Sequence, residues 1–398
     1  MELKPGYKRT EVGVIPEDWE AESLGYISEV VMGQSPVGTS YNQDGYGIPL
    51  INGPTEFTEK YPIKKQWTTE PTKICKAGDL LLCVRGSSTG RMNISNDEYC
   101  IGRGIAAIRA KRGADTKFIT FQIDSAIQKL LALSAGSTFP NVDGKSIRSI
   151  TIPLPPLPEQ RAIAAALSDV DALISALDKL IAKKRDIKQA TMQQLLTGKT
   201  RLPGFEGEWE MKRLGEMAFV ATGNTPPTSD PSNYGDDQLF VSPADLGKRK
   251  YILDTEKKLS KKGFSISRKF PKGSILFTCI GSTIGKAGIA LDELTSNQQI
   301  NAIFPDEKFS NDFLYYSLDF HSPKIRALAS EQAVPIINKT EFEKIIIRLP
   351  PLPEQQALAA ILSDMDAEIV ALEERREKSR VMYQGMMQEL LTGKTRLV

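Results

Sequence analysis

Two short loops carry residue types that suit contact with nucleic acid. Gly86 to Arg91 and Gly281 to Lys286 each follow a short apolar run, combine glycine with hydroxyl residues, and end on a cation. Glycine permits close backbone approach, so exposed N–H groups, hydroxyls and the cation can contact phosphates or base edges. A tight turn between two strands with a solvated cation explains the same residues. The candidate contacts are Ser87, Ser88, Arg91, Ser282, Thr283 and Lys286.

A second pair of aligned segments differs in side chains that distinguish bases. Ile101-Gly102-Arg103-Gly104 occupies the place that Ser296-Asn297-Gln298-Gln299 takes in the second half of the chain. Arginine suits guanine and glutamine suits adenine in the major groove, so this divergence could change a sequence preference. Arg103, Gln298 and Gln299 are therefore candidate DNA contacts, and Lys145 is a further one.

The segment from Lys248 to Lys272 is strongly basic. It holds ten lysine and arginine residues against two acidic ones, Asp254 and Glu256. Such a run is commonly a solvated face, and contact with a DNA backbone is the alternative. If the segment binds DNA, the candidate contacts at its start are Lys248, Arg249 and Lys250.

No arrangement of residues in the chain supports catalysis. Thr197 to Thr200 ends like a P-loop, but Gln193 stands where that motif needs glycine, and the segment closes a helix where a P-loop opens one. The four cysteines lack CxxC spacing and the chain has a single histidine, His321, which argues against a metal site. The sequence therefore predicts a non-enzymatic chain with no cofactor or metal of its own.

Composition is that of an ordinary globular protein. The 398 residues are 40% hydrophobic and 25% charged, with a formal net charge of +2. No apolar run is long enough to span a membrane, and the cysteines suit reduced thiols in a cytoplasm. Phosphate affinity grows with the number of cationic contacts, so a DNA-binding role would need locally concentrated charge or a more basic partner.

The elements that must position these residues are duplicated. Leu154–Gln160 returns as Leu349–Gln355, and Leu195–Leu202 returns as Leu390–Leu397. Across this offset of 195 residues, 31 of 49 aligned positions are identical without a gap. The segments that precede each copy are only weakly similar to each other. The chain therefore consists of a duplicated segment, called the frame below, and two diverged segments, called the modules.

Each copy of the repeat predicts one long helix. Apolar residues recur at alternating steps of four and three, which is a heptad seam, and Gly198 and Gly393 suit a left-handed C-terminal cap. A helix of about 38 residues would be roughly 55 Å long. The simplest packing partner for the apolar face of each helix is the other copy in the same chain, in an antiparallel pair. A plain helical hairpin without a spacing role is the alternative. The residues expected to pair the helices or meet a partner are Leu157, Pro158, Ile163, Leu167, Val170, Ile174 and Leu177, and Leu352, Pro353, Leu358, Leu362, Met365, Ile369 and Leu372.

The modules themselves predict mixed α/β structure. Leu80–Val84 and Ile275–Ile280 are expected as buried strands, and Phe118–Leu133 and Phe313–Leu328 as helices. The expected fold class is α+β, with two pseudo-twofold-related mixed α/β domains joined by a long antiparallel two-helix coiled coil. The predicted boundaries are 1–153 and 203–348 for the modules and 154–202 and 349–398 for the repeats.

Four features of the chain point to a known family: the repeated Leu-Pro-Pro-Leu-Pro-Glu-Gln strips, the heptad helices, the Leu-Leu-Thr-Gly-Lys-Thr-Arg-Leu ends and the Ile-Pro-Glu-Asp-Trp entry. In these features the chain resembles the specificity subunit of type I restriction–modification systems. The resemblance implies that each module is a target-recognition domain for one half of a bipartite site in double-stranded DNA. It implies that the helices fix the gap and bind two methyltransferase subunits, which restriction subunits then join. It marks Leu157–Gln160 and Leu352–Gln355 as frame and partner surface. S-adenosylmethionine, ATP and magnesium would belong to those partners.

Two other functional classes compete with this interpretation. A protein-binding scaffold with two interaction modules on a coiled-coil spacer fits the architecture, although the basic segment at 248–272 argues against it. A catalytic chain is disfavoured by the lack of methyltransferase, nuclease and ATPase motifs.

Overall fold

The computed structural model describes residues 5–111, 113–133, 141–329 and 334–397. These residues form two compact units. Unit 1 consists of Met1–Asp178 together with Arg375–Val398, and unit 2 is the continuous stretch Lys179–Glu374. The last part of the chain therefore folds with the first part.

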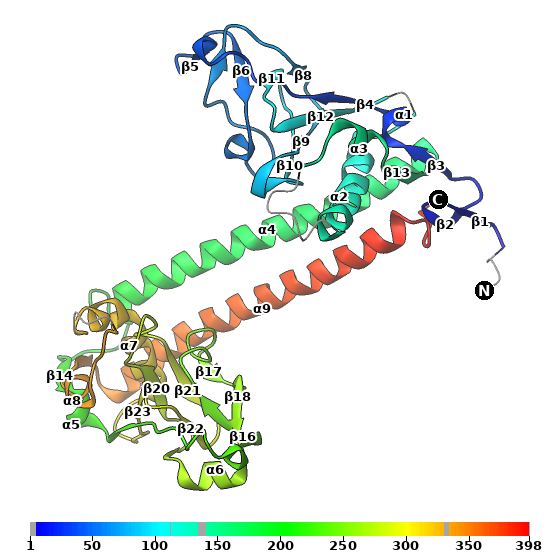
Figure 1. The fold of residues 1–398 in the computed structure, drawn as a ribbon. Coiled ribbons are helices and arrows are strands. Elements are labelled where there is room, and N and C mark those ends of the chain that lie inside the picture. The colour runs from blue at the N-terminus through cyan, green and yellow to red at the C-terminus, as the bar shows by residue number, and fades with distance from the viewer. Residues whose placement is uncertain (1–4, 112, 134–140, 330–333, 398) are drawn as a thin grey trace. The chain divides into compact units, whose positions relative to one another are not determined.

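Unit 1 is built on two sheets (Figure 1). An antiparallel sheet has the order β10-β9-β12-β4, and a mixed sheet has the order β5-β7-β6-β11-β8, in which β6 and β11 are parallel. The strands are β4 (Ser28–Met32), β9 (Leu80–Cys83), β10 (Met92–Ile94) and β12 (Ile105–Ala110), and β5 (Tyr41–Asn42), β6 (Ile48–Ile51), β7 (Trp67–Thr68), β8 (Ile74–Cys75) and β11 (Tyr99–Ile101).

Strand β9 lies between two hydrophobic cores of unit 1. Leu80 and Leu82 join a core with Phe118, while Leu81 and Cys83 join a second core with Tyr99. Successive side chains of a strand point to opposite faces, so a strand covered on both faces is apolar throughout. This explains why an unbroken apolar run predicted the strand correctly.

Smaller elements complete unit 1. They are the hairpin β1 (Tyr7–Thr10) and β2 (Gly13–Pro16), the ribbon β3 (Glu20–Ser23) and β13 (Thr151–Leu154), the helices α1 (Leu24–Ile27), α2 (Thr116–Leu133) and α3 (Gly144–Arg148), and the 3-10 turns η1 (Gly38–Ser40), η2 (Pro54–Glu56) and η3 (Gly86–Ser88).

Unit 2 repeats this plan, with an additional strand next to β21 in one sheet and one strand fewer in the other. Its sheets have the orders β15-β23-β20-β21-β17 and β18-β16-β22-β19. The strands are β15 (Val220–Thr222), β17 (Tyr251–Ile252), β20 (Ile275–Thr278), β21 (Ala287–Ala290) and β23 (Ile300–Ile303), and β16 (Tyr234–Val241), β18 (Lys257–Leu259), β19 (Lys269–Phe270) and β22 (Leu294–Ser296). The other elements are the ribbon β14 (Glu210–Arg213) and β24 (Ile346–Leu349), helices α5 (Leu214–Met217), α6 (Lys261–Ile266), α7 (Asn311–Arg326) and α8 (Lys339–Glu343), and the turn η4 (Pro231–Asn233).

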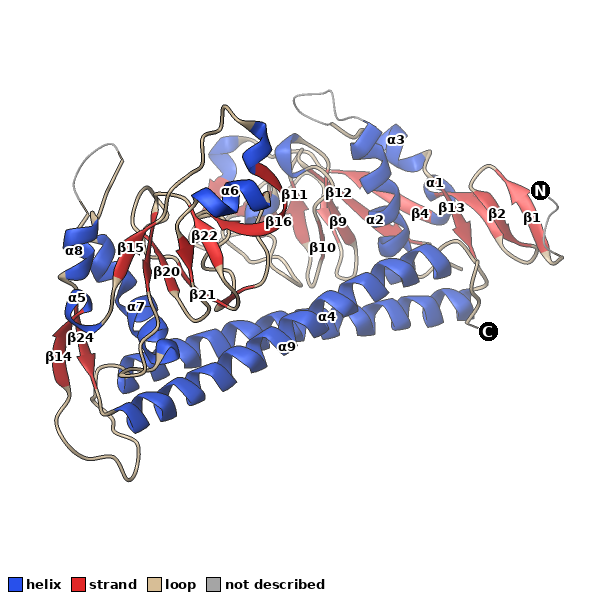
Figure 2. Ribbon diagram, turned by 90° about the horizontal axis from the view of Figure 1, so that it is seen from below, coloured by secondary structure: helices blue, strands red, loops and turns tan. Residues whose placement is uncertain are grey.

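The long helices are α4 (Leu157–Leu195) and α9 (Leu352–Leu390), and in each unit they lie side by side and antiparallel (Figure 2). In unit 1, Ile163 and Leu167 share a core with Leu390, and in unit 2, Leu358 and Leu362 share one with Met192. The predicted α+β class with an antiparallel helix pair is confirmed. No helix among the described residues is long and apolar enough to cross a membrane.

Ion pairs continue the helix pairing where the apolar seam weakens. In unit 1, Asp178 of α4 accepts from Arg376 and Arg380 of α9, at 3.0 and 3.1 Å. In unit 2, Lys188 of α4 pairs with Asp366 at 2.6 Å, and Lys184 pairs with Glu368 at the same distance. Arg376 and Arg380, polar residues in the second half of α9, therefore have a carboxylate partner on α4.

An arginine–glutamate pair joins the two repeated strips in each unit. In unit 1, Arg396 forms a two-point pair with the fully buried Glu159, at 2.6 and 2.7 Å. In unit 2, Arg201 pairs with the fully buried Glu354 at the same two distances. Arg396 also pairs with Asp18 and holds the pKa of that carboxyl below its usual range.

The strip that opens each long helix is partly exposed and partly buried. Both helices begin at the leucine before the proline, so Pro158 and Pro353 are the second helical residues, and both are exposed. Glu159 and Gln160 are buried, and Gln160 accepts from the Asp115 N–H at 2.8 Å. These two residues fasten the helix to its own unit, so only the exposed part of this strip is available as a partner surface.

Candidate nucleic-acid interface

The two glycine-rich loops are tight turns between antiparallel strands. Gly86–Ser88 links β9 to β10, and the Gly90 N–H donates to the Cys83 carbonyl at 2.9 Å. In unit 2, the Gly285 N–H donates to the Thr278 carbonyl at 3.1 Å, between β20 and β21. The alternative of a strand-to-strand turn is thus the observed backbone structure, and it leaves Ser87 and Ser282 exposed.

The cation at the end of each loop remains accessible. Arg91 is exposed, with its Nη2 3.4 Å from the carbonyl oxygen of Phe57, and Lys286 is half-buried. Ser88 and Thr283 are half-buried, and Lys145 is exposed on the short helix α3. Each unit therefore presents a cation beside backbone N–H groups and hydroxyls, the combination that contacts nucleic-acid backbones.

Arg103 lies beside the first loop in unit 1. A surface cavity of about 540 Å³ is lined by Asn52, Arg85, Gly86 and Arg103, among other residues. The structure thus brings together two segments that the sequence marked separately. Arg85 was missed by sequence reasoning because it reads as the end of an apolar run, although an exposed cation there was a usable signal.

The matching part of unit 2 carries amides. Gln298 is exposed and its Oε1 accepts from Thr225 Oγ1 at 2.6 Å. Gln299 is half-buried, and its Oε1 accepts from Asn297 Nδ2 at 3.0 Å. An amide whose oxygen is already bonded is held in one orientation, with its NH2 group available as a donor.

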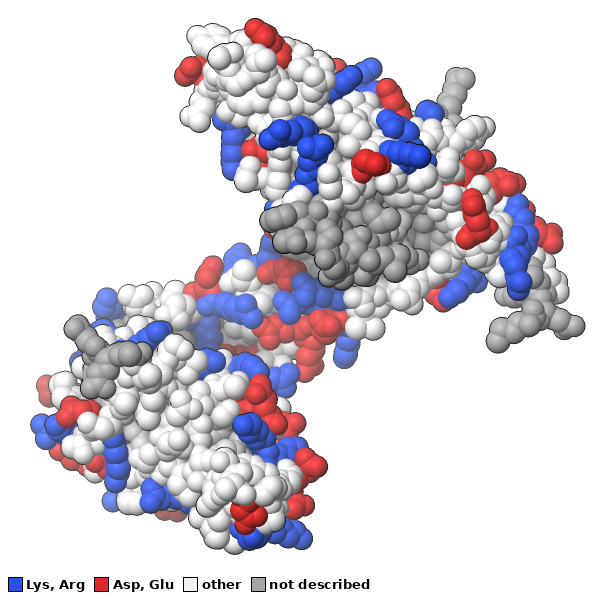
Figure 3. Space-filling model, viewed as in Figure 1, with Lys and Arg blue, Asp and Glu red and all other residues white. Residues whose placement is uncertain are grey.

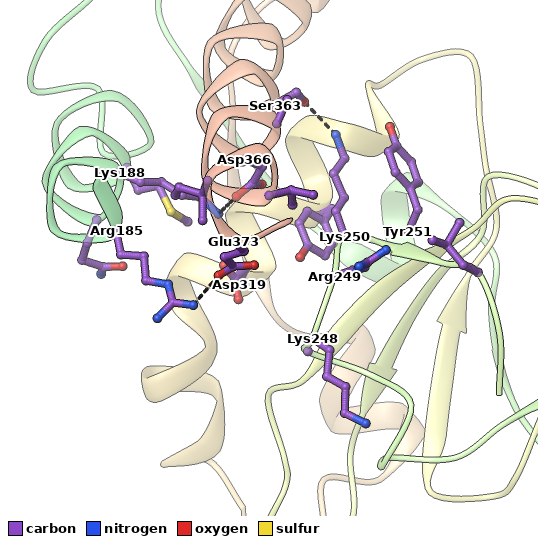
Figure 4. A pocket seen from close by; sticks show the side chains of 18 residues that line it. Arg185, Lys188, Lys248, Arg249, Lys250, Tyr251, Asp319, Ser363, Asp366 and Glu373 are labelled. Carbon is purple, nitrogen blue, oxygen red and sulfur yellow. Dashed lines mark hydrogen bonds and ion pairs between the residues drawn. The ribbon is translucent and has the colours of Figure 1, made fainter. Parts of the chain in front are cut away.

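The basic segment of unit 2 separates into exposed and buried cations. Lys248 and Arg249 are exposed at a cavity of about 670 Å³. Figure 4 shows Lys248 extending away from the helices, whereas Lys250 points toward Ser363. Lys250 Nζ lies 2.7 Å from both Asp312 Oδ1 and Ser363 Oγ. Lys250 is thus corrected from candidate DNA contact to internal ion-pair residue.

The floor of this cavity is a polar cluster between the helices of unit 2. Asp366 accepts from Lys188 at 2.6 Å and from the Tyr316 hydroxyl at 2.7 Å. Burial raises the pKa of the nearby Asp319, with Lys188 opposing the shift and Asp366 adding to it. These groups neutralise one another, so the cavity floor carries no excess of positive charge.

On the face shown in Figure 3, basic side chains are interspersed with acidic ones in each unit. On this face, separate local cations are therefore available for phosphate contact, and not a continuous basic patch.

The described residues include four buried thiols and no group that could hold a metal ion. All four cysteines are free and buried, and burial raises the pKa of Cys83 to about 11 and that of Cys279 to about 12. Thiols with raised pKa values are poor nucleophiles because the thiolate is the reactive form. Within the described ranges, no group of three or more histidine, cysteine or acidic residues could hold a metal ion.

The helix residues marked by the sequence fall into buried and accessible classes. Ile163, Leu167, Leu177, Leu358, Leu362 and Ile369 are buried, whereas Leu157, Val170, Ile174, Leu352, Met365 and Leu372 are half-buried. Pro158 and Pro353 are exposed. The half-buried and exposed members are the ones accessible to another protein.

Residues 16–188 and 206–381 each match the family described as type I restriction modification DNA specificity domain. The chain is 26% identical over 408 residues to the MjaVIII specificity subunit of Methanocaldococcus jannaschii, covering 96% of this chain and 94% of that one. It is 39% identical to the MjaX specificity subunit of the same organism over 199 residues, a match that spans only 49% of this chain and 47% of that subunit.

A solved structure shares the fold. The S subunit of a type I restriction–modification system from M. genitalium superposes with a TM-score of 0.65 at 15% identity, covering 98% of each chain. With two copies of the DNA specificity domain over most of its length, the chain belongs to the type I restriction–modification specificity subunits, a non-catalytic family.

Proposed function

We propose that the chain recognises a bipartite sequence in double-stranded DNA, with one half-site for each unit. The observation that carries this proposal is the presence of two DNA specificity domains in one chain. The order β10-β9-β12-β4 of unit 1 corresponds to β21-β20-β23-β15 of unit 2, while the exposed loops carry different side chains. In this proposal, residues 1–153 and 203–348 are the target-recognition domains, and 154–202 and 349–398 form the spacer between them.

The proposed DNA contacts are the accessible candidates in each unit. They are Ser87, Ser88, Arg91, Arg103 and Lys145 in unit 1, and Lys248, Arg249, Ser282, Thr283, Lys286, Gln298 and Gln299 in unit 2. Phosphate contacts fix the register of a protein on DNA, and base-edge contacts supply the sequence preference.

The partners that we propose follow from the same family. Helices α4 and α9 fix the gap between half-sites and bind two methyltransferase subunits, to which restriction subunits are added. S-adenosylmethionine, ATP and magnesium are bound by those subunits, and the assembly works where the cellular DNA lies, in the cytoplasm. The accessible residues of the helices and the exposed prolines supply side chains for such contacts.

Base-resolved adenine methylation tests the proposal. DNA is sequenced from cells that co-express the chain and its methyltransferase partner, with either the wild-type residues 17–153 or those of another specificity subunit. We expect one two-part motif with a fixed gap, in which the exchange alters only one half. An unchanged motif after the exchange, or an assembled complex that methylates without sequence preference, would contradict the assignment.

A further inference from the structure

The cavity between the two marked loops of unit 1 holds a pair of free arginines. Arg85 and Arg103 are both exposed, and they line the same cavity with Asn52, Gly86 and Gly104. Among the residues that the structure describes, neither guanidinium has an ion-pair or hydrogen-bond partner. A guanidinium that pairs with a neighbouring carboxylate mainly stabilises the fold. The guanidinium groups of Arg85 and Arg103 have no such partner in the described part of the chain and line one cavity, so both can donate hydrogen bonds to a ligand with several acceptor atoms.

Backbone hydrogen bonds fix the segments that carry these arginines. The Val84 N–H donates to the Gly104 carbonyl at 2.9 Å, which joins the residue before Arg85 to the residue after Arg103. The Arg103 N–H donates to Ser35 Oγ at 3.2 Å. A Cβ on Gly104 would lie 2.8 Å from the Asn52 carbonyl oxygen, so glycine allows this close approach. The arginines therefore project from a preorganised turn.

Unit 2 has the same backbone scaffold with different side chains. The Cys279 N–H donates to the Gln299 carbonyl at 2.8 Å, which corresponds to the bond from Val84 to Gly104. On this scaffold, Ile280 stands in the place of Arg85, and Gln298 in the place of Arg103. The two units thus keep one geometry and exchange the residues that it presents.

The side-chain differences between the two units distinguish positions expected to contact bases from positions expected to contact phosphates. Phosphate contact is independent of sequence, so a phosphate-binding position should keep its cation in both units. The end of the glycine-rich loop does so, with Arg91 in unit 1 and Lys286 in unit 2. Arg85 and Arg103 have no cationic counterpart, which is the pattern expected of positions that differ with the target.

We propose that this cavity of unit 1 binds the major-groove edge of a guanine, with Arg103 donating to O6 and N7 and Arg85 supporting it from the neighbouring loop. The inference rests on the proposed function of the chain. Guanine presents two acceptors side by side in the major groove, and the planar guanidinium matches them with two parallel N–H donors. The amide of Gln298 suits an adenine at the matching place in unit 2.

The test compares methylation motifs from cells that express single variants with the methyltransferase partner. Arg103→Gln and Arg85→Ile install the residues of unit 2, while Arg103→Lys keeps the charge and removes the two-point donor geometry. For Arg103→Gln and Arg103→Lys, we expect methylation at guanine-containing sites to fall roughly tenfold to hundredfold. The guanine requirement should relax at one position of one half-site, and the other half-site should be unchanged. Gln298→Ala is the matched control and should relax only the other half-site.

Three outcomes would overturn the inference while leaving the proposed function intact. They are a bipartite motif without guanine in the half-site that Arg103 variants affect, an Arg103→Gln motif identical to wild type, and a uniform loss of methylation with unchanged base preference, which would make Arg103 a phosphate contact. Failure of the proposed function is distinct, because the assembled wild-type complex would then show no sequence-dependent methylation. Since both arginines are exposed, thermal unfolding of the variants should match wild type.

Discussion

At the scale of single residues, burial decides which cations are available to DNA. Lys248, Arg249 and Lys250 are consecutive, yet only Lys250 is buried, with Asp312 and Ser363 as partners. A buried charge that loses its partner destabilises the fold, whereas an exposed cation adds to phosphate affinity. Neighbouring lysines should therefore respond to the same substitution in opposite ways.

We expect Lys250→Gln to lower stability and Lys248→Gln to lower DNA affinity. The first change should cost about 1–3 kcal/mol in urea unfolding, because Asp312 and Ser363 lose a charged donor. The second should leave unfolding unchanged, weaken binding to specific and non-specific duplexes alike, and reduce the salt slope of binding by about one. A stable Lys250→Gln variant with a reduced salt slope would instead place Lys250 at the DNA.

At the scale of elements, the helix ends carry a matched pair of glycines. Gly198 and Gly393 both have positive φ, 69° and 72°, as their caps require. Their surroundings differ, because an added Cβ would lie 3.7 Å from Trp209 at Gly198 but 2.4 Å from Pro16 at Gly393. The first site has room for a methyl group and the second does not.

Gly393→Ala should therefore be more destabilising than Gly198→Ala. The strained φ alone costs about 1 kcal/mol, and the clash with Pro16 adds a further penalty of roughly 1–3 kcal/mol. Urea unfolding of the two variants, each compared with wild type, measures the difference. Equal losses in the free energy of unfolding would mean that the backbone around Pro16 shifts to accommodate the methyl group without an energetic penalty.

The elements that the sequence predicted best are those whose pattern reports burial directly. The apolar runs of β9 and β20 and the heptads of α4 and α9 have one physical cause each, so their spacing was sufficient. The arginine–glutamate pairs could not be found in this way, because Glu159 and Arg396 are 237 residues apart. Arg85 and Arg103 come together through a backbone hydrogen bond between loops, which leaves no periodic signal.

At the scale of the whole molecule, each unit depends on an arginine from the end of a repeat. Arg396 neutralises the buried Glu159 in unit 1, and Arg201 neutralises the buried Glu354 in unit 2. Removing one member of a buried pair leaves an uncompensated charge, which costs about 3–5 kcal/mol. The two arginines thus allow each unit to be destabilised on its own.

Arg396→Gln should weaken unit 1, and Arg201→Gln should weaken unit 2. Hydrogen exchange followed by mass spectrometry resolves the two effects, since peptides from 5–178 and from 179–374 report on different units. We expect faster exchange in peptides from the affected unit and little change in the other. Equal acceleration in both units for either variant would show that they unfold as one cooperative body.

The discontinuity of unit 1 also sets an order of folding during synthesis. Unit 2 is one uninterrupted stretch, so all of its residues have been translated before Arg375, where the second part of unit 1 begins. Unit 1 lacks Leu390, Leu391 and Arg396 until all of unit 2 has been translated, and these residues complete its core and neutralise Glu159. The unit whose synthesis starts first is therefore completed only after every residue of the other unit has been added.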